Sequence, residues 1–301
     1  MKKIILLLVI ALLGYSAANS QSTHQLAFYG GTGLSALSYT PVKGTASLDI
    51  GGQFGVHYYL YFSPHWGVGT GLGLAFYNAH FSTGSFTDHY AMQDVDGKNF
   101  EFRIAMNRYD EKQQATFLEI PVMARFRTTG TRQFSAAAGV KIGLPLQFDY
   151  KTEKLNAATT GFYARENYVY GKPEDGTAFT HMGFSSSPPI TLAATNGELK
   201  PAITWALAAE AGMNLVYNEN FMFYAGLYID YGLNNLIDDE TTAAVVEYNA
   251  ANPQEYKINS VLTSKYATDN GRKAFVDKIS TISIGLKIAF VFGIGTKGGQ
   301  P

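Results

Sequence analysis

The sequence contains no cysteine and has few charged residues for its length. Charged residues make up 16% of the 301 residues, and the formal net charge is −1, whereas about a quarter of an average soluble domain is charged. The absence of cysteine excludes a disulfide framework, a thiolate metal site and a lipid anchor on cysteine. The small net charge excludes the basic surface typical of nucleic-acid binding, so we expect no nucleic-acid partner.

The chain also lacks a long apolar run after its first 20 residues. A membrane-spanning helix needs about 18 or more consecutive apolar residues, and no later stretch approaches this. At the start, Lys2 and Lys3 precede an apolar run from Ile4 to Leu13, and Ala18 and Ser20 stand at cleavage-site spacing. This order predicts a secretory signal peptide over residues 1–20 and a mature barrel domain over residues 21–301. A short membrane anchor is the alternative, which the length of the run disfavours.

Glycine, tyrosine and phenylalanine are abundant, and they lie in segments with strict alternation. From Ile282 to Phe292 every second residue is apolar, and the residues between them as far as Ala289 are small or polar. This pattern predicts a β-strand with one apolar face. A strand that crosses a bilayer at a tilt needs about 9–11 residues. Eight segments fit this description: 25–37, 48–62, 66–76, 116–127, 134–148, 203–217, 221–231 and 278–292.

The connections between these segments alternate in length, and this predicts the topology. Short turns follow the second, fourth and sixth segments, whereas long connections follow the others. Bacterial outer-membrane barrels have an even number of strands, short periplasmic turns and long extracellular loops. We therefore predict an all-β fold: an eight-stranded antiparallel transmembrane β-barrel, integral to the lipid of the outer membrane, with both termini periplasmic. A secreted soluble all-β domain is the alternative, and it would have to bury the long apolar faces.

Charged and small residues on the polar faces of the strands are predicted to line the barrel lumen. Gly67, Gly69, Gly71 and Gly73 share one face of a single segment, where they would leave room for bulky side chains from other strands. An eight-stranded barrel is just filled by its side chains, so buried charges there must be paired. We expect a salt-bridged plug formed by Asp49, Glu119, Arg125, Lys141, Glu210, Asp230 and Lys287.

Two other interpretations of the lumen charges stay open at this point. The charges could line a path or gate for small solutes, or Glu119 and Glu210 could act as a pair of acid and base. We expect no cofactor and no metal site, because the six histidines are scattered and none stands at ligand spacing. Asp94, Asp96, Asn99 and Glu101 have calcium-like spacing but lack the full 12-residue loop. Together with the turn signal Asp96-Gly97 they predict a plain hairpin turn within the polar segment 78–114.

The long connections are the remaining candidate for a functional surface. They are rich in tyrosine, which is common at protein interfaces, and loops on a rigid barrel often carry binding residues. The candidate contact residues are Tyr163, Tyr168, Tyr170, Tyr248, Tyr256 and Tyr266. The alternative is that these tyrosines pack the connections against each other.

Three features resemble the PorT-like outer-membrane β-barrel families of Bacteroidota. They are the LEIP stretch from Leu118 to Pro121, the glycine-rich strand from Gly67 to Leu74, and Lys287 among apolar neighbours in the last strand. The resemblance implies an integral outer-membrane location, and some members of these families belong to protein-secretion machinery. We therefore expect a non-enzymatic structural or interaction role, with an envelope or secretion-system protein as partner. A small-solute outer-membrane transporter or channel is the second hypothesis, and an outer-membrane enzyme is the third.

Overall fold

The structure, a computed structural model, describes residues 23–218, 220–237 and 243–294. The signal peptide predicted over residues 1–20 lies outside these residues, as does part of the tight turn expected at 218–220.

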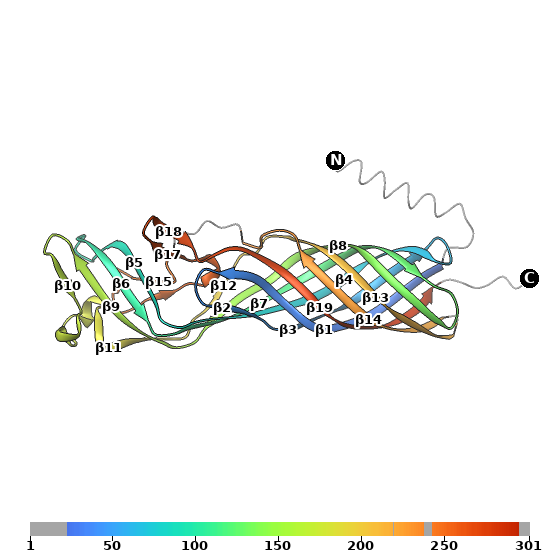
Figure 1. The fold of residues 1–301 in the computed structure, drawn as a ribbon, viewed down its shortest axis with the longest axis horizontal. Helices are drawn as coiled ribbons and strands as arrows, with labels where there is room; N and C mark the ends of the chain where they lie inside the picture. Colours follow the sequence, from blue (N-terminus) through green and yellow to red (C-terminus); the bar gives the residue numbers. More distant parts are fainter. Residues whose placement is uncertain (1–22, 219, 238–242, 295–301) are drawn as a thin grey trace, which may run out of the picture.

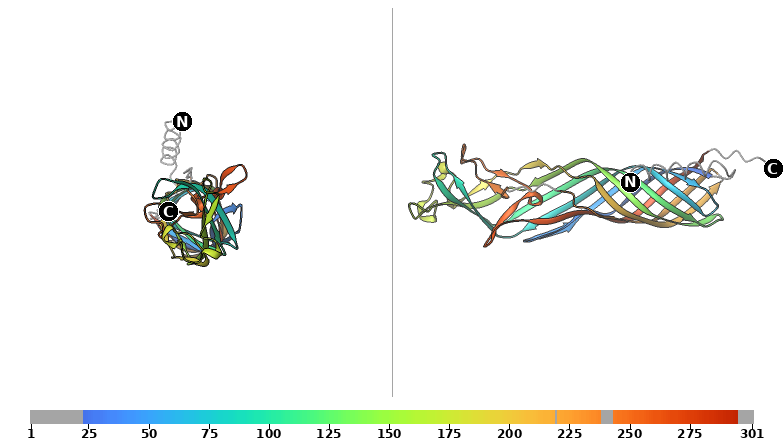
Figure 2. Two further views of the ribbon diagram at one scale, coloured as in Figure 1. Left: turned by 90° about the vertical axis from the view of Figure 1, so that its left-hand side faces the viewer. Right: turned by 90° about the horizontal axis from the view of Figure 1, so that it is seen from above.

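Eight strands form a closed barrel in which each strand pairs antiparallel with its neighbours (Figure 1). The last strand pairs with the first, as in the match of His24 with Ile294, and the view along the axis in Figure 2 shows the ring. All eight predicted strands are confirmed, and most run longer than predicted. They are β1 (Thr23–Pro41), β3 (Ile50–Tyr61), β4 (Trp66–Thr83), β7 (Tyr109–Arg127), β8 (Arg132–Thr152), β13 (Thr204–Asn218), β14 (Phe221–Gly232) and β19 (Val276–Ile294).

The two ends of the barrel differ in their connections. At one end lie the short links from β3 to β4, from β7 to β8 and from β13 to β14, together with the start of β1 and the end of β19. We call this the short-turn end and the opposite one the long-loop end. The alternation of connection length predicted from the sequence is therefore present in the structure.

The outside of the barrel is apolar. Leu72, Leu227 and Leu286 are more than half exposed, and Phe62 and Trp66 are similarly exposed at the short-turn end. Polar and small side chains alternate with these and point inward, as expected for strands with one apolar face. The outer surface therefore carries the apolar band that contact with lipid requires.

Glycines on the inner face make room for large side chains, as predicted. A Cβ added at Gly69 would lie 3.0 Å from the ring of Tyr59 and 3.1 Å from Cδ of Arg125. A Cβ at Gly73 would collide with the hydroxyl of Tyr29, which reaches across from β1. The glycines of β4 thus leave the space that large aromatic and charged side chains from other strands occupy in the narrow interior.

A bulge in β8 changes the direction of its side chains. Phe117 pairs with Pro145 whereas Thr116 pairs with Gln147, so Leu146 is an extra residue on β8. Strict alternation along the predicted segment 134–148 puts Phe148 on the same apolar, outer face as Phe134. After this bulge, however, Phe148 points inward and is 2% exposed. The outward prediction for Phe148 was therefore wrong, because a single extra residue exchanges the two faces of a strand.

Three barrel strands continue beyond the long-loop end into a second sheet (Figure 1). β4 leads into β5 (Phe86–Gln93), β6 (Asn99–Met106) leads into β7, and β8 leads into β9 (Leu155–Tyr163). The order across this sheet is β5, β6, β9, with β10 (Tyr168–Tyr170) and β11 (Ser185–Leu192) both on the far side of β9. The hairpin predicted within 78–114 is confirmed as β5 and β6.

Short elements complete the long-loop end. The connection between β14 and β19 forms two ribbons, β15 (Val246–Glu247) with β16 (Lys257–Ile258) and β17 (Lys265–Thr268) with β18 (Gly271–Ala274). β2 (Thr45–Leu48) pairs with β4, and β12 (Asn196–Glu198) pairs with β8. The 3-10 helices are η1 (Pro173–Asp175), η2 (Thr180–Met182) and η3 (Val261–Thr263). Within the described residues, no helix has the length and apolar character needed to cross a membrane.

The second sheet packs on a buried aromatic cluster that it shares with the rim of the barrel. Phe102 and Phe184 are fully buried, and Tyr248 from the connection between β14 and β19 packs against both rings. The buried cluster extends from these rings to Phe81, Phe117 and residues of the barrel rim. The long connections are therefore a folded unit, of which the sequence predicted only the hairpin within residues 78–114.

The fit of the inner glycines can be tested with Gly69→Val. The added methyl groups would press against Tyr59 and Arg125, and overpacking of this kind costs roughly 1–3 kcal/mol. We expect a lower unfolding temperature in detergent, followed by the change in gel mobility between folded and unfolded barrels. The control is Gly84→Val, since a Cβ at Gly84 meets no atom within 4 Å. Equal unfolding temperatures for the two variants would refute the packing role of Gly69.

Candidate functional site

The barrel interior contains six of the seven charged residues predicted to line it, and each is between 3% and 7% exposed. They lie on five strands, and the alternation of side chains along each strand directs them into the lumen. They are Glu119 and Arg125 on β7, Lys141 on β8, Glu210 on β13, Asp230 on β14 and Lys287 on β19. Their contacts divide them into two groups of three, which we name the Lys141 triad and the Glu210 triad after the central residue.

The Lys141 triad joins two carboxylates to one ammonium group. Nζ of Lys141 lies 2.7 Å from Oδ2 of Asp230 and 3.0 Å from Oε2 of Glu119. It also donates a hydrogen bond to Oε1 of Gln53 at 2.8 Å, and the hydroxyl of Tyr77 donates to Oε1 of Glu119 at 2.6 Å. With two carboxylates and one cation, the triad carries a formal charge of −1.

The Glu210 triad has the opposite balance. Oε1 of Glu210 accepts from Nη1 of Arg125 at 2.5 Å, and Oε2 accepts from Nζ of Lys287. The guanidinium of Arg125 lies 3.8 Å from the centre of the Tyr59 ring, and Nζ of Lys287 lies 4.3 Å from that of Tyr29. Two cations and one carboxylate give a formal charge of +1, so the two triads together are neutral.

This arrangement gives each of these six charged residues an opposite partner. Buried ions persist only when they are paired and hydrogen-bonded, because desolvation costs several kcal/mol per ion. Glu119 and Glu210 belong to different triads, and each is occupied by cations of its own, so the structure does not bring them together as a pair of acid and base. The geometry is that of a charge-paired plug.

Asp49 is not part of this plug. It precedes β3, its side chain is exposed, and its Oδ1 accepts a hydrogen bond from the backbone N–H of Ile50 at 2.7 Å. The prediction of a lumen position for Asp49 was wrong because it extended the alternation of β3 by one residue too many. Gln53 on β3, which was not among the predicted site residues, accepts a hydrogen bond from Lys141 instead.

The second candidate site is a groove at the long-loop end. A cavity of about 780 Å³ lies between β5 and the connection that follows β14. One wall is formed by Tyr90, Ala91 and Met92 of β5. The remaining lining residues are Thr195, Ala244, Glu247, Tyr248, Asn249, Ala250, Glu255, Tyr256, Lys257, Ile258 and Arg272.

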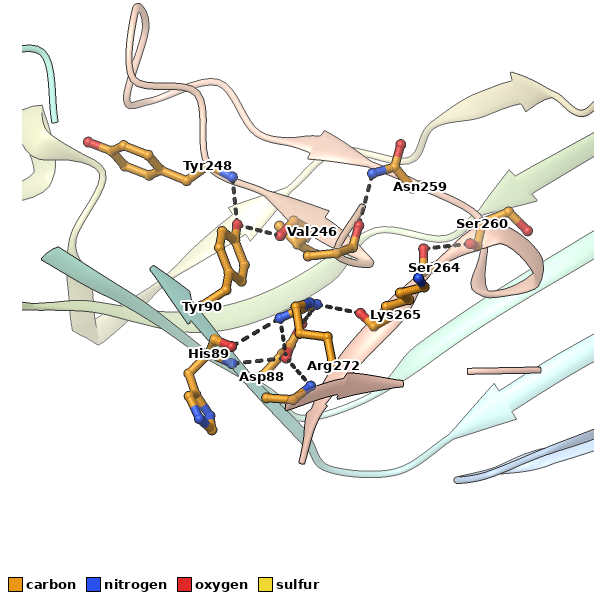
Figure 3. A network of polar contacts seen from close by, with 12 residues as sticks. Asp88, His89, Tyr90, Val246, Tyr248, Asn259, Ser260, Ser264, Lys265 and Arg272 are labelled. Carbon is orange, nitrogen blue, oxygen red and sulfur yellow. Dashed lines mark hydrogen bonds and ion pairs between the residues drawn. The ribbon is translucent and has the colours of Figure 1, made fainter. Parts of the chain in front are cut away.

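An ion pair holds the β17–β18 ribbon against β5 beside this groove (Figure 3). Arg272 donates to both carboxylate oxygens of Asp88, at 3.2 Å and 2.8 Å, and its Nη1 also donates to the carbonyl of His89 at 3.0 Å. Asp88 is 3% exposed and accepts the backbone N–H of Ala267 as well. This two-point contact is the geometry that Arg and carboxylate favour, and we call it the Asp88–Arg272 latch.

The tyrosines proposed as contact residues mostly pack the folded unit. Tyr163, Tyr248 and Tyr266 are each less than a tenth exposed. Burial raises the pKa of Tyr248 to about 12, and also that of Tyr256 to about 12. Both hydroxyls therefore stay protonated at neutral pH and donate to backbone carbonyls of residues 182 and 183. The alternative of loop packing is the better account of these side chains.

The segment with calcium-like spacing is a hairpin turn. Oδ1 of Asp94 accepts the backbone N–H groups of Asp96 and Lys98, and its Oδ2 accepts the hydroxyl of Tyr163 at 2.9 Å. Gly97 has a φ of +77°, which suits glycine at this point of the turn. Among the described residues, no group of three His, Asp or Glu is placed to hold a metal ion.

A closed ring of eight antiparallel strands with an apolar outside and a paired polar inside defines a transmembrane β-barrel. The chain belongs to the family described as outer membrane protein beta-barrel domain, whose model matches residues 17–238. It is therefore an outer-membrane β-barrel protein.

Solved structures of outer-membrane proteins are similar to this chain at low identity. Ail, the attachment invasion locus protein of Yersinia pestis, is 12% identical, with 91% of this chain and 100% of Ail covered and a TM-score of 0.30. A major outer membrane protein from Thermus thermophilus is 13% identical, with 90% and 99% covered and a TM-score of 0.36. A comparison with the curated protein sequences gave no match.

Lys141→Met tests the pairing in the lumen. The substitution leaves Glu119 and Asp230 buried without their cation, which costs roughly 3–5 kcal/mol. We expect a clearly lower unfolding temperature in detergent. The control is Lys151→Met on the same strand, where the side chain is exposed. A variant at position 141 that is as heat-resistant as the control would contradict the plug.

Asp88→Asn tests the latch. The loss of the charge should weaken the interaction between residue 88 and Arg272 by roughly 1–3 kcal/mol. The effect falls toward the lower end of this range because solvent screens the partly exposed Arg272. We expect faster hydrogen exchange at the amide of Ala267 and faster proteolysis of the β17–β18 ribbon, with the barrel intact. Asp96→Asn, at an exposed turn position, serves as the control. Unchanged exchange at Ala267 would show that the latch does not hold the ribbon.

Proposed function

We propose that this protein is a non-conducting outer-membrane barrel that presents its folded long-loop unit to a protein partner in an envelope or secretion assembly. The observation that carries the proposal is the second sheet, whose buried aromatic cluster is continuous with the rim of the barrel. Strands β5, β6 and β9 continue the barrel strands, and the Asp88–Arg272 latch stabilises them, so they form a rigid surface. Rigid scaffolds are the usual support for binding loops. The LEIP stretch and the glycine-rich strand support membership of the PorT-like families.

The orientation in this proposal follows the usual arrangement of bacterial barrels. The short turns and both termini face the periplasm, and the second sheet is extracellular. A secretory signal peptide over residues 1–20 would deliver the chain to the envelope. We propose no catalysis, because the carboxylates of both triads are occupied by cations.

The lumen supports a closed state of the barrel. Both triads and the rings of Tyr29, Tyr59 and Tyr77 are buried within it, and eight strands leave an interior only wide enough for side chains. We expect no steady conductance when the purified protein is incorporated into planar lipid bilayers. Steady ohmic openings would favour the second hypothesis, transport of small solutes through the lumen.

Site-specific photocrosslinking in intact cells tests the presentation of the second sheet. A photoreactive residue at Val95, which is 73% exposed in the β5–β6 turn, should yield a discrete protein adduct. The same residue at Leu286, which is 65% exposed on the outer face of β19, should yield adducts with lipid. Protein adducts from the Leu286 position alone would move the interaction surface to the barrel wall and refute the proposal.

A further inference from the structure

The second sheet ends in a strand with one unpaired edge. Among the strands that the structure describes, β5 is terminal in the order β5, β6, β9 and pairs with β6 alone. The carbonyl of His89 accepts Arg272 from the β18 side, so it points away from β6. Residues two apart in a strand direct their backbone groups to the same side, and the β5–β6 register is regular. The N–H and C=O groups of Ala91 and Gln93 therefore also point to the free edge.

The first half of this edge is covered, whereas the second half is not. Arg272 bonds the carbonyl of His89, and the amide of Ala267 reaches the neighbouring Asp88 side chain. Among the described residues, none bonds the backbone groups of Ala91 or Gln93 on that side. Exposed edges in soluble regions are usually protected by charge or proline, but Tyr90, Ala91, Met92 and Gln93 include neither.

The groove lies along this uncovered half. Three consecutive residues of β5 line one wall of the groove. Because consecutive side chains of a strand point to opposite faces of the sheet, the cavity borders the edge of β5 and not one of its faces. Across from β5 lie Glu247 and Lys257 of the β15–β16 ribbon, which form an ion pair at 3.4 Å. The cavity of about 780 Å³ is therefore a slot beside unpaired backbone donors and acceptors.

We propose that the free edge of β5 binds an extended segment of a partner protein as an added β-strand, with main-chain hydrogen bonds to Ala91 and Gln93. This inference rests on the proposed function and names the mode of recognition. Unpaired N–H and C=O groups spaced along a strand can form hydrogen bonds with the backbone of another extended segment, as in other cases of strand addition to a sheet edge.

The two faces of the sheet define the side chains of the partner segment. In β6, Phe100 and Phe102 are buried on the core face, whereas Glu101 and Arg103 form an ion pair on the outer face. A strand added next to β5 meets the same two environments, because it continues the same pleated surface. The partner segment therefore alternates apolar residues, toward Met92 and the groove, with polar residues on the outer face.

The test uses a fluorescein-labelled peptide with the sequence of β6, residues 99–106, whose alternation already matches this sheet. We expect it to bind the detergent-solubilised protein and to slow hydrogen exchange at the amides of Ala91 and Gln93. Ala91→Pro removes an outward donor without breaking the β5–β6 ladder, and it should weaken binding about tenfold. Ala91→Thr keeps the donor and should bind like the natural protein.

Several results would overturn the inference. These are absence of binding to the natural protein, equal binding by Ala91→Pro, or equal binding by a peptide N-methylated at alternate residues. Gln93→Pro provides a second edge variant, and the heat resistance of each variant reports whether the barrel is folded. A dimer that Ala91→Pro abolishes would assign the edge to a second copy of this chain and also overturn the inference.

The outcome is separable from that of the proposed function. If the Val95 position crosslinks a partner equally well in the Ala91→Pro background, presentation of the sheet stands and strand addition fails. If the barrel conducts steadily, the proposed function fails whatever the peptide does.

Discussion

The structure depends on one constraint, that backbone polar groups in the apolar band must be paired within the protein. Unpaired N–H and C=O groups in hydrocarbon cost several kcal/mol each, so a sheet there has no free edge. The pairing of β1 with β19 along their whole lengths satisfies this condition. Beyond the band the constraint no longer holds, and β4 and β8 leave the ring as β5 and β9. The barrel sheet is therefore closed, whereas the second sheet has a free edge.

A second requirement acts inside the ring, where charges must be compensated. The Lys141 and Glu210 triads carry opposite formal charges and together connect five strands. This pairing holds the strands in register as well as filling the lumen with polar side chains. It also leaves these six charged groups occupied by one another, so interaction with other molecules falls to the long-loop end.

The long-loop end combines a rigid core with an incomplete edge. Stacked, tilted and edge-to-face ring contacts link Phe100, Phe102, Phe184 and Tyr248, and the Asp88–Arg272 latch closes half of the β5 edge. The other half borders a groove. Families of outer-membrane barrels share the ring, and their members differ in what is built on it. In this protein the addition is a continuation of the barrel wall, so it is positioned by the barrel strands themselves.

The sequence by itself determined the eight strands, their inner and outer faces and the alternation of short and long connections, because these follow from local periodicity. It also indicated six of the residues that pair in the lumen. Only the tertiary structure decided which charges meet, since Arg125 and Glu210 are 85 residues apart in the chain. Likewise, the bulge at Leu146 that turns Phe148 inward, the exposed position of Asp49 and the folding of the long connections into a sheet depend on pairing between distant segments. Such pairing leaves no periodic signal in the local sequence.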